Sequence, residues 1–216
     1  MAEFAVHIKQ ADHNQQVALA LLQQEPFHDW AINAAFYSAI HLFEAWLYHR
    51  GPKHSETDIP RDDKGDLKFS PHAWREKLVT DRLPRHAFKD YRHLKESSET
   101  ARYLSLPRSA GPGANWTPTG AWEHLSLDDA RRMVNNHLAS FTKTLDLEYS
   151  QFIESIDFES TVGNSAPIVR QTLIRDYSDR QSLMKESLSE LRRKYGAGVA
   201  EAFRIAAEKK PNTAPQ

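Results

Sequence analysis

The sequence predicts an all-α protein, a bundle of four or five helices followed by a C-terminal helical extension. Apolar residues recur every three or four positions over most of the chain, and Pro and Gly fall between these periodic segments. No stretch alternates apolar and polar residues as a half-buried strand does. A chain of 216 residues is long enough to bury its own core, so this fold needs no disulfide or metal.

Residues 29–49 form the most apolar of the predicted helices. Intervals of three and four residues place Tyr37 and Ile40 on one face, and aromatic side chains occupy another face. The residues of this second face are Phe36, Phe43 and Trp46. A helix that is apolar over so much of its circumference packs at the centre of a bundle, so we expect this segment to be the most buried.

Capping residues and helix breakers mark the other helices of the bundle. These helices are predicted over residues 3–24, 70–81, 85–104 and 126–152. Ser70 and Pro71 provide an N-cap and a first-turn proline, and Ser126 and Asp129 have the spacing of a capping box. Residues 105–123, rich in Gly and Pro, are predicted to form a long loop.

The predicted domain boundary lies at residues 161–164, which are Thr-Val-Gly-Asn. We therefore assign residues 1–160 to the bundle, residues 165–210 to an amphipathic helical extension and residues 211–216 to a disordered tail. From Ser165 onward the chain has ten basic and six acidic residues, although its overall net charge is -1. This basic end fits a solvated helix face, or contact with RNA or an acidic partner.

The amino-acid composition indicates the cellular compartment and excludes several kinds of chemical site. The chain contains no cysteine, which excludes disulfides, zinc–thiolate sites and thiol nucleophiles. The N-terminal residues lack a basic segment followed by an apolar run, and nowhere do 18 apolar residues follow one another. We therefore predict a soluble, cytoplasmic protein that does not bind membranes. The eleven histidines show no HExxH or comparable ligand spacing, so neither a metal nor another cofactor is expected.

Three segments occur in the same order as in bacterial HEPN-type proteins (higher eukaryote and prokaryote nucleotide-binding). Residues 35–45 (AFYSAIHLFEA) resemble the aromatic-Tyr-Ala-x-x-His-x-x-x-Ala pattern of their central helix. Residues 70–79 (SPHAWREKLV) are similar to their Ser-x-His-x-x-Arg segment, and residues 91–103 (YRHLKESSETARY) to their Tyr-x-x-Leu helix that ends in Ser-x-x-Ala-Arg-Tyr. The resemblance covers residues 29–150.

This resemblance implies a bundle of four or five helices, often dimeric, with a role in RNA cleavage or in toxin–antitoxin, stress and defence systems. Catalytic HEPN proteins resemble one another in an Arg-x4–6-His motif, which implies Arg132 and His137 as the catalytic pair. An imidazole of near-neutral pKa removes the proton of the ribose 2′-hydroxyl, and a guanidinium stabilises the phosphate without a metal. The sequence leaves open whether the chain cleaves RNA.

Polar residues on packed helix faces indicate a binding pocket between residues 29–49 and 85–104. The predicted binding residues are Tyr37, His41, His72, Arg75, Tyr91, Lys95 and Arg102. Buried polar groups cost free energy when they are unpaired. These groups therefore either satisfy one another, as in a buried pair of Arg102 with Glu44, or receive an anion such as RNA phosphate.

Two functions follow from these observations. The first is a HEPN-type protein that acts on or with RNA, with metal-independent endoribonuclease activity as one possibility. The second is a noncatalytic module that docks a partner protein, such as an antitoxin, through residues 165–210. We expect a homodimer in both cases, because the second aromatic face of residues 29–49 exceeds what one small bundle covers.

Overall fold

A computed structural model of the chain describes residues 4–24, 26–50, 54–103, 124–177 and 179–208. These residues are mostly helical and contain no β-strand, apart from one isolated antiparallel bridge between Arg61 and Leu67. The predicted all-α class is therefore confirmed. The chain divides into two compact units, Met1–Leu145 and Asp146–Gln216, and each has its own core.

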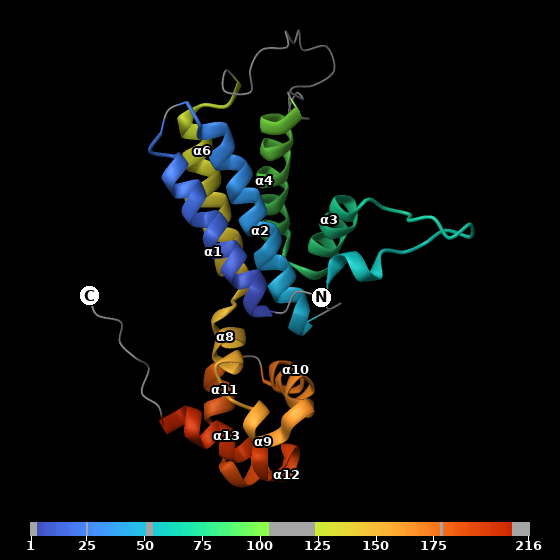
Figure 1. Cartoon of the computed structure of the whole chain (residues 1–216), viewed down its shortest axis with the longest axis vertical. Coiled ribbons are helices and arrows are strands. Elements are labelled where there is room, and N and C mark those ends of the chain that lie inside the picture. The colour runs from blue at the N-terminus through green and yellow to red at the C-terminus, as the bar shows by residue number, and fades with distance from the viewer. Residues whose placement is uncertain (1–3, 25, 51–53, 104–123, 178, 209–216) are drawn as a thin grey trace. The chain divides into compact units, whose positions relative to one another are not determined.

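Helix α2 is the centre of the first unit. The elements of this unit are α1 (Phe4–Leu21), α2 (His28–Arg50), the 3-10 helix η1 (Ser55–Asp58), α3 (Pro71–Arg82), α4 (Arg85–Tyr103), α6 (Leu127–Arg132), the π-helical segment η3 (Met133–Leu138) and α7 (Ala139–Leu145). Helices α1 and α2 lie antiparallel side by side, with α4 along α2 (Figure 1). Because α6, η3 and α7 also contact α2, most of its side chains are buried, as predicted.

The second aromatic face of α2 is covered inside the first unit. Phe36 and Phe43 are fully buried, and the Trp46 ring stacks on Phe43 with centroids 5.7 Å apart. The exposed aromatics of α2 are instead Trp30, at 58% exposure, and Tyr37, at 38%. Phe36 and Phe43 of this face therefore belong to the core, because α1, α4 and α7 pack around α2, whereas Trp46 is only partly buried. The expected homodimer stays a prediction.

The predicted helix starts are confirmed by their caps. The Ser70 hydroxyl accepts a hydrogen bond from the Ala73 amide at 3.2 Å, and Pro71 occupies the first turn of α3. Ser126 and Asp129 form the predicted capping box, in which each side chain accepts from the other residue's amide. Both caps satisfy amides at a helix N-terminus, which have no partner within the helix itself.

The long helix predicted over residues 126–152 is interrupted at Asp146. This residue has a φ of 45°, a left-handed conformation that Asp tolerates better than most residues. Helix α7 therefore ends at Leu145, and the next helix begins at Glu148. Tyr149 and the residues after it pack into the second unit, so the break between units precedes the predicted boundary at residues 161–164.

The second unit is a small helical domain in its own right. Its elements are α8 (Glu148–Glu154), α9 (Glu159–Val162), the 3-10 helix η4 (Gly163–Ser165), α10 (Ala166–Asp176), α11 (Arg180–Met184), α12 (Leu188–Tyr195) and α13 (Ala197–Glu208). Its core includes Phe158, Leu173 and Leu191, so it is more than an amphipathic extension. The predicted loop over residues 105–123 and the tail over 211–216 lie outside the described residues.

Candidate functional site

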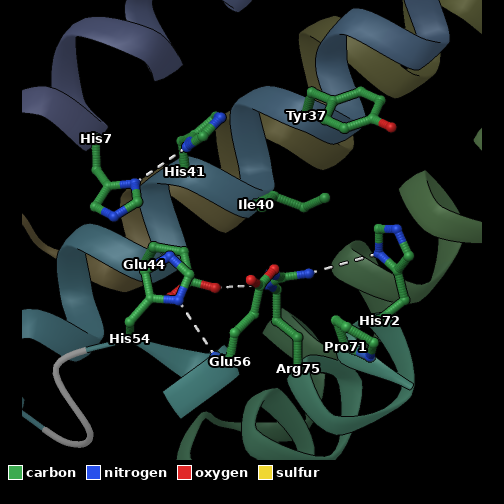
Figure 2. A pocket seen from close by; sticks show the side chains of 10 residues that line it. All are labelled: His7, Tyr37, Ile40, His41, Glu44, His54, Glu56, Pro71, His72 and Arg75. Atoms are coloured by element: carbon green, nitrogen blue, oxygen red, sulfur yellow. Dashed lines mark hydrogen bonds and ion pairs between the residues drawn. The ribbon is translucent and has the colours of Figure 1, made fainter. Parts of the chain in front are cut away.

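An open cavity of about 250 Å³ lies in the first unit where α1, α2, η1 and α3 meet (Figure 2). Its lining is rich in imidazole, carboxylate and guanidinium groups. The lining residues are His7, Tyr37, Ile40, His41, Glu44, His54, Glu56, Pro71, His72 and Arg75. A cavity lined by several converging polar groups is the default candidate for a ligand site.

Helical spacing explains why these side chains converge. On α2, residues 37, 40, 41 and 44 are separated by three or four positions, so they share one face. His72 and Arg75 are one turn apart on α3. His7 comes from α1. His54 caps η1, where its Nδ1 accepts a hydrogen bond from the Glu56 amide at 3.3 Å.

A buried ion pair between Arg75 and Glu44 is part of the cavity lining. Arg75 Nε donates to Glu44 Oε1 at 2.6 Å, and the two side chains are only 4% and 1% exposed. The Ser55 amide donates to Glu44 Oε2 at 2.9 Å, and the Ser55 hydroxyl donates to Glu44 Oε1. Burial opposes ionisation of Glu44, but Arg75 and the two Ser55 donors outweigh it and hold the Glu44 pKa below its usual value.

The outer nitrogens of Arg75 have longer contacts. Nη2 donates to Glu56 Oε1 at 3.4 Å, and Nη1 lies 3.5 Å from His72 Nδ1. Both distances are at the long limit of a hydrogen bond, and the Glu56 side chain is 53% exposed. An anionic ligand in the cavity could therefore replace these contacts without breaking the pair with Glu44.

Three histidines of the cavity, His7, His41 and His72, have pKa values below that of a free imidazole. His7 Nδ1 and His41 Nδ1 lie 3.1 Å apart, so one of the two atoms carries a proton and the other accepts it. Burial lowers the pKa of His7 from 6.5 to about 4, and it also lowers the pKa of His41 and His72. Arg75 adds to the effect on all three histidines. These imidazoles are thus proton acceptors at neutral pH.

The charge of the lining limits how it binds an anion. Glu44 and Arg75 carry opposite charges and offset one another, while the lowered pKa values of His7, His41 and His72 keep these three imidazoles neutral near pH 7. A phosphate in the cavity would be attracted by the Arg75 nitrogens and would raise the pKa of these histidines, so its binding would be accompanied by proton uptake.

The structure gathers four of the seven predicted binding residues at the cavity: Tyr37, His41, His72 and Arg75. The other three lie on α4. Tyr91 is fully buried with its ring 5.7 Å from Phe36, and Lys95 pairs with Glu76 at 2.8 Å. Arg102 contacts Tyr37 and does not pair with Glu44, because Arg75 of α3 takes that carboxylate. The cavity thus lies beside α3 and not between α2 and α4.

Arg132 and His137 each pair with a different residue. Arg132 is exposed and pairs with Asp129 one turn earlier in α6. His137 Nδ1 lies 2.8 Å from Asp90 Oδ1, and its ring centroid is 4.7 Å from that of His93. Among the described residues, no hydrogen bond or ion pair joins Arg132 to His137. His137 therefore belongs to a separate Asp–His contact between α4 and η3.

Sequence reasoning missed three residues of the cavity. His7 gave a usable signal, because it is spaced three and four residues from Phe4 and Ala11 and so occupies a core position of α1. His54 and Glu56 gave none, since they lie in a charged connector without periodicity. Their positions follow from the fold of η1 against α2 and α3.

The described part of the chain contains no group of three or more His, Cys, Asp or Glu residues placed to hold a metal ion. Within the same part, every helix is too short or too polar to cross a lipid bilayer.

No family model, curated protein or solved structure matches the chain. The resemblance to HEPN-type proteins rests on its three segments alone, all in the first unit. The segments over residues 35–45 and 70–79 lie in α2 and at the start of α3, and they supply seven of the ten residues that line the cavity. The third segment, over residues 91–103, lies in α4 and supplies none.

Proposed function

We propose that the first unit is a HEPN-type bundle that binds single RNA strands and cleaves them without a metal at the cavity of Figure 2. The observation that carries this proposal is the convergence of a buried guanidinium and several neutral imidazoles on one open cavity. These are the groups that metal-independent cleavage of a phosphodiester needs. The resemblance suggests a toxin–antitoxin, stress or defence role for such an activity.

Each group has a defined task in the proposed reaction. A neutral imidazole, assigned to His41, takes the proton of the ribose 2′-hydroxyl, and the 2′-oxygen forms a bond to phosphorus. The bond from phosphorus to the 5′-oxygen breaks, and a protonated imidazole, assigned to His72, gives its proton to that oxygen. Arg75 holds the charge that develops on the phosphate oxygens. The products are a 2′,3′-cyclic phosphate and a free 5′-hydroxyl.

The geometry supports these assignments. Arg75 touches His72 directly, and its charge lowers the pKa of His41, so the guanidinium acts on both histidines. The two histidines come from different helices, α2 and α3, which are joined by the ion pair of Arg75 with Glu44. A phosphate beside Arg75 offsets the positive charge there and so favours protonation of His72.

Cleavage of a fluorescein-labelled single-stranded RNA in EDTA tests the proposal. His41→Gln and His72→Gln are each expected to slow cleavage by about 100-fold, the lower end of what general acid–base catalysis contributes. His13→Gln is the matched control, because His13 is an exposed histidine of α1 outside the cavity. Mass spectrometry of the product checks for the cyclic phosphate.

Two outcomes would contradict the proposal in different ways. Loss of cleavage in His137→Gln, with His41→Gln and His72→Gln fully active, would move the chemistry to the contact of His137 with Asp90. A wild-type chain that neither binds nor cleaves single-stranded RNA at any pH from 5.5 to 8 would remove the RNA function altogether.

A second candidate function is supported by the second unit. This unit has a complete core, yet it leaves large apolar side chains on its surface, namely Ile168, Met184, Leu188 and Ile205. Such residues fit a noncatalytic role in which the unit docks a partner protein such as an antitoxin. Calorimetric titration with the protein encoded by the adjacent gene tests it, with Ile168→Glu expected to weaken binding. Light scattering of the chain alone tests the homodimer that the sequence predicts.

A further inference from the structure

An exposed aromatic ring lies at the mouth of the cavity. Tyr37 is 38% exposed, whereas its neighbours Phe36 and Ile40 on α2 are 0% and 6% exposed. It lies one turn before His41 and lines the same cavity. Figure 2 shows its ring at the edge of the group, with the hydroxyl directed away from Glu44 and Arg75. An apolar ring left in solvent beside a charged cavity is a surface for stacking.

Arg102 of α4 holds this ring in place. Its Nη1 donates to the Tyr37 hydroxyl at 3.1 Å, and its Nε donates to the Ser98 carbonyl at 3.4 Å. The guanidinium carbon lies 5.7 Å from the centroid of the Tyr37 ring. A tyrosine fixed at its hydroxyl loses little further side-chain freedom when a ligand stacks on it.

Arg75 lines the same cavity as Tyr37, and Arg102, which contacts Tyr37, also contributes to the lowered pKa of His72. Consecutive phosphates of one nucleic-acid strand can follow two such charges, while the base between them meets the aromatic face.

We infer that Tyr37, held by Arg102, is a stacking platform for an unpaired RNA base next to the phosphate bound at Arg75. This inference rests on the proposed function and names its substrate class, which is single-stranded RNA. Paired bases are stacked on one another and cannot reach the ring, so a duplex of the same sequence binds poorly at this site.

Fluorescence anisotropy tests the inference with a labelled adenine oligomer of about twelve nucleotides, 2′-O-methylated so that it stays intact. Tyr37→Leu is expected to weaken binding about tenfold, which corresponds to about 1.4 kcal/mol, because the aromatic face is lost. Tyr37→Phe keeps the ring and is expected to stay within about threefold of wild type. Trp30→Leu is the matched control, since Trp30 is an exposed aromatic two turns earlier on α2 and outside the cavity.

A series of oligomers, each with one abasic sugar at a different position of the strand, makes the test specific. If Tyr37 stacks on a base, wild type loses affinity for the abasic strand at one position, and Tyr37→Leu then causes no further loss. Independent, additive losses would overturn the inference, as would equal losses in Trp30→Leu and Tyr37→Leu. Wild-type binding that is unaffected by Tyr37→Leu removes the platform and leaves the RNA proposal standing. Absence of any wild-type binding removes both.

Discussion

Glu44→Gln is the substitution whose effect the structure determines most closely. The change keeps the shape of the side chain and removes its negative charge. Arg75 then stays buried with Glu56 as its remaining carboxylate, at 3.4 Å and on the surface. The new amide also places an N–H group where Glu44 now accepts from Ser55 or Arg75. The substitution therefore breaks a buried pair and leaves donors facing one another.

The expected cost follows from the burial of the pair. Removing one partner of a buried ion pair costs about 3–5 kcal/mol, and the remaining contact with Glu56 places this case near about 3 kcal/mol. For a unit of this size, about 3 kcal/mol corresponds to a decrease in melting temperature of roughly 10 °C. A surface ion pair such as Lys77 with Asp81 gives less than about 1 kcal/mol and is the matched comparison.

Urea denaturation followed by circular dichroism at pH 7 measures the loss, and a double-mutant cycle assigns it. Arg75→Met alone leaves Glu44 buried with only its Ser55 donors, so it is also expected to be costly. The double variant, Glu44→Gln with Arg75→Met, should lose less than the sum of the two single variants, because no unpaired charge remains. Additive losses, or a loss below about 1 kcal/mol for Glu44→Gln, would refute this reasoning.

The same pair makes a prediction about pH. Because the Glu44 pKa in the folded state is held below its usual value of 4.5, ionised Glu44 stabilises the fold at pH values above 4.5. That stabilisation is lost as the pH falls through the folded-state pKa. The stability difference between wild type and Glu44→Gln should therefore be constant from pH 6 to 8 and shrink as the pH falls below 4.5.

Three further outcomes are expected. The His7 pKa of about 4, against 6.5 when unfolded, should make stability fall as the pH drops from 6.5 to 4, by at most about 3 kcal/mol, and His7→Gln should flatten this slope in urea melts. Because the pKa values of His41 and His72 are lowered, the protonated acid is scarce at neutral pH, so RNA cleavage should be faster at pH 6 than at pH 8 in single-turnover assays. Glu56→Gln removes a negative charge from the rim and should tighten RNA binding about threefold or more, measured by anisotropy at constant salt.

Most of the bundle could be predicted from the sequence, because local chemistry sets where its helices begin and how they bury their faces. Ser70 and Ser126 cap their helices as expected, and the apolar circumference of residues 29–49 identified the central helix. The prediction failed at Asp146, where a positive φ ends a helix whose apolar spacing continues unbroken into α8. Apolar periodicity predicts that a side chain is buried, but it does not indicate in which of the two cores the side chain packs.

The candidate site could be predicted only in part, for a similar reason. Tyr37, His41 and Glu44 share a face by their spacing alone, so their proximity followed from the sequence. The partner of Glu44 did not follow from the sequence, because the helical spacing allows either Arg75 of α3 or Arg102 of α4 to face α2. The choice between them depends on how α3 and α4 pack against α2, which is a tertiary property.

Arg75 contacts two carboxylates that differ in burial. We expect the buried one to matter for the stability of the fold and the exposed one for ligand binding. Glu44 is buried, has two further donors from Ser55 and holds Arg75 Nε at 2.6 Å, so its carboxylate is fully occupied by the protein. Glu56 is half exposed and lies 3.4 Å from Nη2, so under the proposed function it is the carboxylate that we expect a phosphate to displace. Substitution of Glu44 should therefore act mainly on the fold, and substitution of Glu56 mainly on the ligand. Arg75 can therefore act in both folding and binding through different nitrogens. Its Nε donates to the buried Glu44 carboxylate, and its Nη2 is available to a ligand in the cavity.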